Sequence, residues 1–198
     1  MIEAVRSIPG VTAAGTVNRV PFTGGLRGVP IFQPGTTEFT LNNSVLAPYV
    51  FTISPGYLEA AGTRLLGGRD FSWRDTTQTP YVAIVNETFA RKMWGDTPAI
   101  GQRFHRTGPL DRSRGRGGGR QIPRRCKSRR SQWCICRCRK TSRTNMIFVA
   151  RSQRAQNEMA AALERTLNGL EPDARITVQS WLEVLRAECA VPGPGGKQ

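Results

Sequence analysis

The first apolar positions of the chain follow the period of a helix and then that of a strand. Residues 1–9 (MIEAVRSIP) carry an apolar side chain at about every third position, as one face of a helix would. A Pro-Gly pair then predicts the end of this helix. The run VTAAGTVN at 11–18 predicts a strand, and the Gly-, Pro-, Thr- and Asn-rich residues 21–43 predict a long loop or hairpin region.

Two further elements are predicted before residue 63. The run VLAPYVFTI at 45–53 is typical of a strand that is bent, or lies at a sheet edge, because of its proline. SPGYLEAAG at 54–62 predicts a short helix. Ser54 would cap it, Pro55 would suit the first helical position, and Gly62 would end it.

The middle of the chain has the clearest helix signals. YVAIVN at 81–86 is a compact apolar strand, and Asn86 is placed to cap a helix over 87–94 that Gly95 would close. The buried side of this helix is expected to hold Phe89, Met93 and Trp94.

Strands and helices continue to alternate in the last third of the chain. MIFVAR at 146–151 and RITVQS at 175–180 predict strands, the segment 156–170 predicts a helix, and SWLEVLRAE at 180–188 predicts another. The helix 156–170 should turn Met159, Ala162, Leu163 and Leu167 to the core. This alternation indicates a mixed α/β or α+β protein without internal repeats.

The charge of the chain is concentrated in one segment. Thirteen of the 29 Lys and Arg lie within 111–144 beside one acid, which leaves 16 Lys and Arg against 13 Asp and Glu elsewhere, a net charge of +3. Any argument for nucleic-acid binding from charge therefore depends on this segment alone. We expect no signal peptide, because Met1 opens directly onto a helix pattern of mixed polar and apolar residues. We expect no membrane span, because no window of about 18 apolar residues occurs.

Few residues outside that segment suggest chemistry. His105 is the one histidine of the chain and has no cysteine or acid pair near it in sequence. We interpret Asp70 and Asp75 as flanking a turn, and Glu87 as a favourable charge in the first turn of a helix. Asp96 is a further scattered acid. The sequence therefore predicts no catalytic, cofactor-binding or metal-binding residues, and no enzyme.

The residues of the basic segment suggest two candidate functions. Its cysteines (Cys126, Cys134, Cys136 and Cys138) run C-x7-C-x-C-x-C, which is too tight for a structural zinc site. On a strand, the last three could bind a soft metal through one face. Alternatively, the Arg-rich residues 112–143, with Trp133, could bind RNA or another nucleic acid.

Two longer stretches carry a family resemblance. ISPGYLEAAGTRLLGGRDFSWRD at 53–75 and VAIVNETFARKMWGDTPAIGQRF at 82–104 closely resemble the MacB-like periplasmic core domain of FtsX/MacB-type ABC transporter permeases. The beginning of the chain resembles the opening helix and strand of that domain, and the part after residue 144 resembles its closing portion. The resemblance divides the chain into domain residues 1–106 and 145–186, an aberrant basic segment 107–144 and an aberrant tail 187–198.

The resemblance implies a fold and a role. The fold would be α+β, a periplasmic core domain of mixed sheet with short helices, disrupted by a basic, poorly ordered insert. Such a domain has no active site and needs no cofactor. It transmits or senses the movement of transmembrane helices that a separate ABC ATPase drives, on the periplasmic face of the inner membrane. Its partners would be those helices, the ATPase and, as an open alternative, a second copy. Nucleic acid is not expected.

The genetic code offers an explanation for the basic segment. The codons that encode DRSRGRGGGRQI at 111–122, read one base downstream, permit IEVVGVVADGKY, and those of SQWCICRCR at 131–139, read two bases downstream, permit PVVYLPLSQ. Both strings are what the resembled family has there. We therefore interpret 107–144 and the tail as frame-shifted and the chain as a fragment. We expect the segment to be disordered or poorly packed and to leave the core with exposed strand edges.

Overall fold

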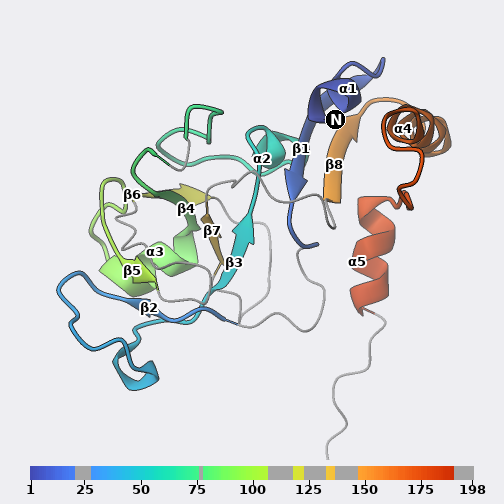
Figure 1. Ribbon diagram of the computed structural model, residues 1–198. Coiled ribbons are helices and arrows are strands. Elements are labelled where there is room, and N and C mark those ends of the chain that lie inside the picture. Colours follow the sequence, from blue (N-terminus) through green and yellow to red (C-terminus); the bar gives the residue numbers. More distant parts are fainter. Residues whose placement is uncertain (21–27, 76–77, 107–117, 123–132, 137–146, 190–198) are drawn as a thin grey trace, which may run out of the picture.

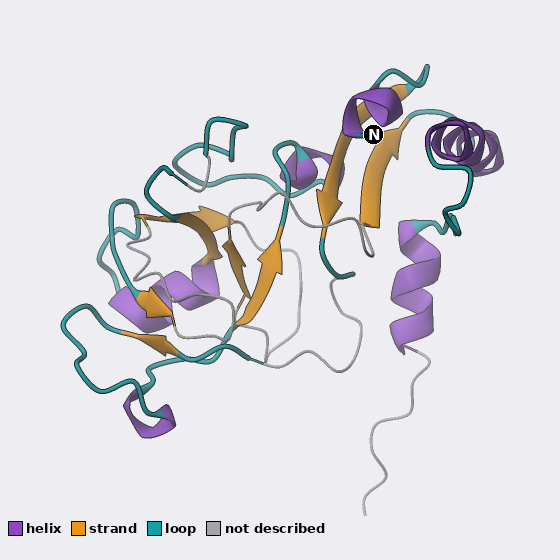
Figure 2. Ribbon diagram, in the orientation of Figure 1, coloured by secondary structure: helices purple, strands orange, loops and turns teal. Residues whose placement is uncertain are grey.

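A computed structural model describes residues 1–20, 28–75, 78–106, 118–122, 133–136 and 147–189 of the chain. The elements form two groups (Figures 1 and 2). The terminal group contains α1 (Ile2–Arg6), β1 (Val11–Val17), β8 (Ile147–Ser152), α4 (Gln156–Leu170) and α5 (Trp181–Cys189). The sheet group contains β2 (Ile31–Phe32), η1 (Leu41–Asn43), β3 (Tyr49–Thr52), β4 (Val82–Asn86), α3 (Glu87–Trp94), β5 (His105–Arg106), β6 (Gly118–Ile122) and β7 (Trp133–Cys136).

The terminal group is built on an antiparallel pair of strands that are far apart in sequence. β1 pairs with β8, with Ala14 opposite Ala150 and Val17 opposite Ile147. α1 and α4 pack against this pair through a cluster of Val5, Ala14 and Leu167. A neighbouring cluster of Ile8, Met159 and Ala162 continues the contact between the two helices. The predicted apolar faces of both helices are therefore confirmed.

The main sheet of the other group has the order β3-β7-β4-β6. β7 runs parallel to β3 and antiparallel to β4, and β6 runs parallel to β4. Two pieces of the basic segment thus enter the sheet, and the expectation that this segment is disordered is wrong for them. The sequence of β7 is apolar (WCIC), whereas that of β6 (GGRQI) is not, and main-chain hydrogen bonds can pair such a strand whatever its side chains.

Helix α3 has the bounds and cap that the sequence predicts. The side-chain Oδ1 of Asn86 accepts a hydrogen bond from the N–H of Phe89 at 2.9 Å. Phe89 and Met93 are buried together with Phe104, and the rings of Phe89 and Phe104 meet edge to face at 5.4 Å between centroids. This second core also contains Ile31 of β2, so it holds the short strands of the sheet group against the helix.

Two predicted elements differ in the structure. Helix α2 (Tyr57–Ala60) begins at Tyr57, with Gly56 rather than Ser54 at its N-cap. Pro55 therefore precedes the helix, and the Ser54 hydroxyl bonds β1 instead. Residues 175–180 form no strand, and among the described residues the β1–β8 pair has no third strand.

One apolar core connects the two groups. Val17 of β1, Phe51 of β3, Tyr57 and Leu58 of α2, and Ile84 of β4 pack into a single buried cluster, which Ile53 and Phe71 complete. Helix α2 lies between the groups in Figure 1. Since close-packed apolar side chains resist relative displacement, the cluster fixes the sheet group to the strands of the terminal group.

Candidate functional site

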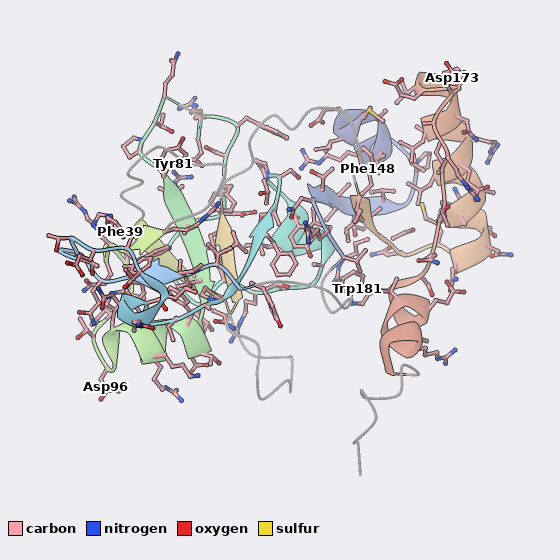
Figure 3. All side chains as sticks on the ribbon, turned by 60° about the horizontal axis from the view of Figure 1, so that its bottom comes forward. Phe39, Tyr81, Asp96, Phe148, Asp173 and Trp181 are labelled. Atoms are coloured by element: carbon pink, nitrogen blue, oxygen red, sulfur yellow. The ribbon has the colours of Figure 1, made fainter. Side chains whose placement is uncertain are left out.

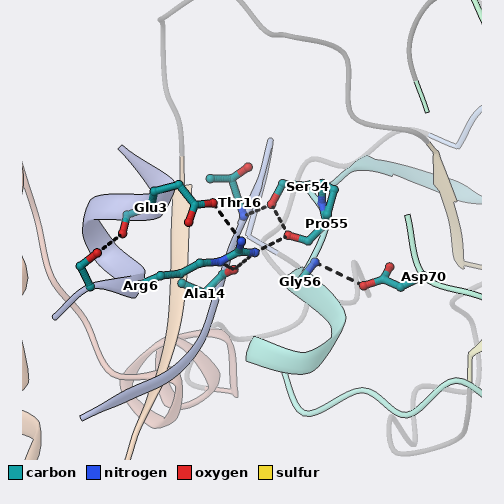
Figure 4. Close-up of polar contacts among 9 residues, drawn as sticks. Glu3, Arg6, Ala14, Thr16, Ser54, Pro55, Gly56 and Asp70 are labelled. Atoms are coloured by element: carbon teal, nitrogen blue, oxygen red, sulfur yellow. Dashed lines mark hydrogen bonds and ion pairs between the residues drawn. The ribbon is translucent and has the colours of Figure 1, made fainter. Parts of the chain in front are cut away.

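The junction of α1, β1 and α2 holds a network of long-range polar contacts, and Arg6 lies at its centre (Figure 4). Arg6 is in the last turn of α1. Its Nε and Nη2 donate to the carbonyl oxygen of Ala14 in β1 at 3.3 and 3.0 Å, and Nη2 also donates to that of Pro55 at 3.1 Å. Its Nη1 pairs with Glu3 at 3.0 Å. One guanidinium thus connects three segments of the chain.

Two glycines make room for these contacts. Gly56 has a φ of +82°, and a Cβ there would lie 2.5 Å from Nη2 of Arg6. Gly15 of β1 lies against the start of α2, where a Cβ would come within 2.5 Å of the main-chain nitrogen and Cα of Tyr57. Larger residues at either position would separate the strand, the helix or the arginine from the others.

Ser54 bonds the segment before α2 to β1. Its hydroxyl accepts a hydrogen bond from the N–H of Thr16 at 2.8 Å, and its own N–H donates to the carbonyl oxygen of Thr16 at 3.0 Å. The same hydroxyl donates to the carbonyl oxygen of Pro55 at 3.2 Å. Ser54 is completely buried, so the loss of these partners would leave polar groups unsatisfied inside the protein.

Asp70 extends the junction toward the sheet group. One carboxylate oxygen accepts from the N–H of Gly56 at 3.3 Å, and the other accepts from the N–H of Phe71 at 2.7 Å. Phe71 is buried in the core that the two groups share. The start of α2 is thereby connected both to α1, through Arg6, and to the shared core.

The end of α2 is connected to β8. The Nε of Arg151 donates to the carbonyl oxygen of Ala60 at 3.4 Å. Gly62 follows with a φ of +67°, and an added Cβ would collide with the guanidinium of Arg151. Gly62 thus ends the helix as predicted, although the sequence gives no sign of the arginine that packs on it. Both ends of α2 are held by arginines of the terminal group.

The junction offers rigid attachment rather than acid–base chemistry. Burial raises the pKa of Tyr57 to about 12, so its phenol is neutral at physiological pH. Around the junction, the polar side chains bond main-chain groups, which fixes elements relative to each other. Within the described residues, no group of three or more His, Cys, Asp or Glu side chains could hold a metal.

Of the scattered acids predicted to be structural, Asp70, Asp75 and Glu87 have structural partners. Asp75 forms an ion pair with Arg69, and its pKa falls to about 2, first because Arg69 bonds the carboxylate and also because the N–H of Ser72 does. Glu87 pairs with Arg91 along α3 at 2.8 Å. Asp96 lies on the surface after α3, away from α4 and α5, as Figure 3 shows.

The two remaining candidates for chemistry are placed only in part. His105 lies in β5, and its ring meets Phe39 edge to face at 5.9 Å between centroids, which is a packing contact. Of the clustered cysteines, Cys134 and Cys136 belong to β7, while Cys126 and Cys138 lie outside the described residues. Most of 112–143, the candidate nucleic-acid segment, lies outside them too.

Sequence reasoning missed the central residue of the junction. Arg6 is 49 positions from Pro55, and no local pattern signals such a contact. The one available sign is the pair of glycines, at 15 within a strand and at 56 before a helix. An isolated glycine in a strand indicates the close approach of another main chain.

Searches by sequence and by structure give different results. No family model and no curated protein matches the sequence. The periplasmic region of MacB from Actinobacillus actinomycetemcomitans superposes with a TM-score of 0.61 at 13% identity, over 97% of this chain and 82% of that one. Within the described residues, no helix combines the length and the apolar character that crossing a membrane requires.

Two other solved structures are similar. The extracellular domain of the noncanonic ABC-type transporter YknZ from Gram-positive bacteria has a TM-score of 0.55 at 14% identity, with 86% of this chain and 82% of that one covered. A domain of a putative permease protein from Porphyromonas gingivalis has a TM-score of 0.56 at 15% identity, with 94% and 88% covered. The chain therefore has the α+β fold of MacB-like periplasmic domains, as its sequence resemblance led us to expect.

Proposed function

We propose that the chain is the extracytoplasmic domain of an ABC transporter permease, and that it transmits movement without catalysing a reaction. The likeness to three domains of MacB, YknZ and a permease, over 86–97% of this chain, carries the proposal. On this proposal the domain lies on the periplasmic face of the inner membrane. Its partners are transmembrane helices and a separate ABC ATPase.

The junction supports the mechanical part of this proposal. In the resembled family the elements at the two ends of the domain connect to transmembrane helices, which here corresponds to α1 on one side and α4 and α5 on the other. Arg6 of α1 bonds the segment just before α2, and Arg151 of β8, the strand that precedes α4, bonds the end of α2. Helix α2 in turn belongs to the shared core. A displacement of α1 is therefore passed to the sheet group through Arg6, the start of α2 and the shared core.

Hydrogen exchange can test the proposal in a membrane. A chimera in which this chain replaces the periplasmic region of MacB would be purified in lipid nanodiscs, and amide exchange would be measured with and without ATP. We expect ATP to change exchange in residues 53–62, which contain α2, and Arg6→Ala to remove that change in the sheet group.

The matched control is Arg91→Ala. Like Arg6, Arg91 pairs with a glutamate on its own helix, and this is its one side-chain bond within the part of the chain that the structure describes. Arg91→Ala should leave the response of amide exchange to ATP unchanged. Exchange around α2 that is the same with and without ATP would reject a transmitting role. Salt-sensitive RNA binding by the unmodified chain in a filter assay would instead favour the nucleic-acid reading of 112–143.

A further inference from the structure

We infer that the turn Ser72–Asp75 is a docking site for an acidic and partly apolar segment of a partner protein. The two central residues of this turn are Trp73 and Arg74, and both are exposed, Trp73 at 58%. Tip positions of turns usually hold Gly, Asn, Asp, Ser or Pro, because these residues favour the turn itself. An exposed tryptophan there does not contribute to the core, so folding alone gives no reason for it.

The turn is held in a fixed shape. The N–H of Asp75 donates to the carbonyl oxygen of Ser72 at 3.0 Å, and the N–H of Ser72 donates back to the Asp75 carboxylate at 2.7 Å. The guanidinium of Arg69 donates two hydrogen bonds to the same carboxylate, at 2.6 and 2.5 Å. The side chain of Asp75 is only 8% exposed. These bonds close the turn from both sides.

The turn is also anchored to the body of the protein. Phe71, the residue before it, is 6% exposed and lies in the shared core. Asp70 bonds Gly56 at the junction. Trp73 is therefore presented on a rigid base, and a partner would not have to order it on binding. Preorganised tryptophan and arginine side chains are the residues that most often dominate protein interfaces.

The charge of the loop indicates the chemistry of the partner. Arg64 and Arg74 are exposed, whereas Arg69 and the two carboxylates of the loop are used in internal hydrogen bonds. Leu66, in the same loop, is 45% exposed. The surface offers positive charge beside apolar area, which an acidic and apolar segment complements. A second copy of this surface would bring like charges together.

A protein segment fits this surface better than a lipid bilayer does. Binding to a bilayer surface requires an extended apolar face, such as that of an amphipathic helix. The turn instead exposes one aromatic side chain at its tip, which is the geometry of a single anchor in a pocket. The inference does not depend on the proposed transport role, because it follows from the loop alone.

A titration of the whole 198-residue chain tests the inference. The chain would be labelled with ¹⁵N at the tryptophan indoles, and the probe would be a synthetic peptide of alternating Glu and Leu, with a Gln–Leu peptide as its uncharged match. We expect a selective shift of the Trp73 indole signal with the Glu–Leu peptide, weakened by added salt. Trp73→Ala should lower the affinity at least tenfold, and Arg74→Gln several-fold.

The control is Trp181→Ala, since Trp181 is another exposed tryptophan, at 38%, in α5. It should bind the peptide as the unmodified chain does, and circular dichroism would show that every variant is folded. Equal binding by Trp73→Ala, or a Trp73 signal that does not move, overturns the inference. A larger response to phosphatidylglycerol vesicles than to the peptide also overturns it and assigns the turn to a membrane surface.

Discussion

Arg6 shows how one side chain can decide whether three elements stay together. Its hydrogen bonds to Ala14 and Pro55 are charge-assisted and only partly exposed to water. We expect Arg6→Ala to lower the free energy of unfolding by about 1–3 kcal/mol, because carbonyl groups at the junction lose a charged donor. Urea unfolding measures this.

Arg91→Ala is the matched substitution for that measurement, since Arg91 loses only an exposed pair on its own helix. It should change the free energy of unfolding by about 0.5 kcal/mol or less. If both variants were equally stable, Arg6 would be an ordinary surface residue, and the junction would not depend on it.

Asp75 makes stability depend on acid pH. Its folded pKa is about 2, below the ordinary value of 3.8, so its contribution is complete above pH 4 and disappears as the pH falls through about 2. With half of Arg69 exposed to solvent, we expect about 1–2 kcal/mol from this pair. Urea midpoints from pH 6 to pH 2 should fall less steeply for Asp75→Asn than for the unmodified chain. Parallel curves would mean that the pair contributes nothing.

Residues whose partners lie nearby in sequence could be predicted, and those with distant partners could not. Asn86 caps a helix three residues away, and Asp75 closes a turn over the same distance, so a local pattern indicates both. Arg6 and Arg151 reach acceptors 49 and 91 residues away. Only the folded chain brings such groups together.

At the scale of the elements, Gly15 sets the distance between β1 and α2. We expect Gly15→Ala to destabilise the protein by about 1–3 kcal/mol or more, because the new methyl group meets the main chain of Tyr57, which cannot rotate away. Thermal unfolding would show a lower midpoint. Gly169→Ala in α4, with nothing within 4 Å of the new Cβ, should be neutral or stabilising by up to about 1 kcal/mol. Equal effects would contradict the close packing at Gly15.

Helices were easier to predict than strands. α3 and α4 have periodic apolar faces, and for α3 also a cap, that identify them without knowledge of the rest of the fold. Residues 175–180 have the alternation of a strand but no neighbouring strand to pair with. Ile176 packs instead from an irregular segment onto the cluster of Val5, Ala14 and Leu167. A strand depends on its partner, and no local pattern shows whether a partner is present.

At the scale of the whole molecule, the charge of the basic segment conflicts with the apolar surroundings of the sheet that it enters. β7 is an interior strand, between β3 and β4, and its position 135 stands opposite Phe51 and Ile84, both buried in the shared core. The four residues of β7, WCIC, are apolar, as an interior strand requires, but thirteen Lys and Arg lie around them between residues 111 and 144. Likeness to MacB-like domains over most of the chain coexists with a segment that the same fold would not select.

A chain with the reading frame restored tests this conflict directly. Residues 111–122 would be replaced by IEVVGVVADGKY and residues 131–139 by PVVYLPLSQ, which removes six of the clustered arginines and supplies apolar side chains to the sheet. We expect a higher urea midpoint and a larger m-value, since more apolar surface would be buried on folding, and slower amide exchange in β3 and β4. A chain carrying the same replacement residues in scrambled order is the control. If the restored and scrambled chains were equally stable, the frame-shift interpretation would lose its physical support, and the basic segment would have to be treated as a selected part of the protein.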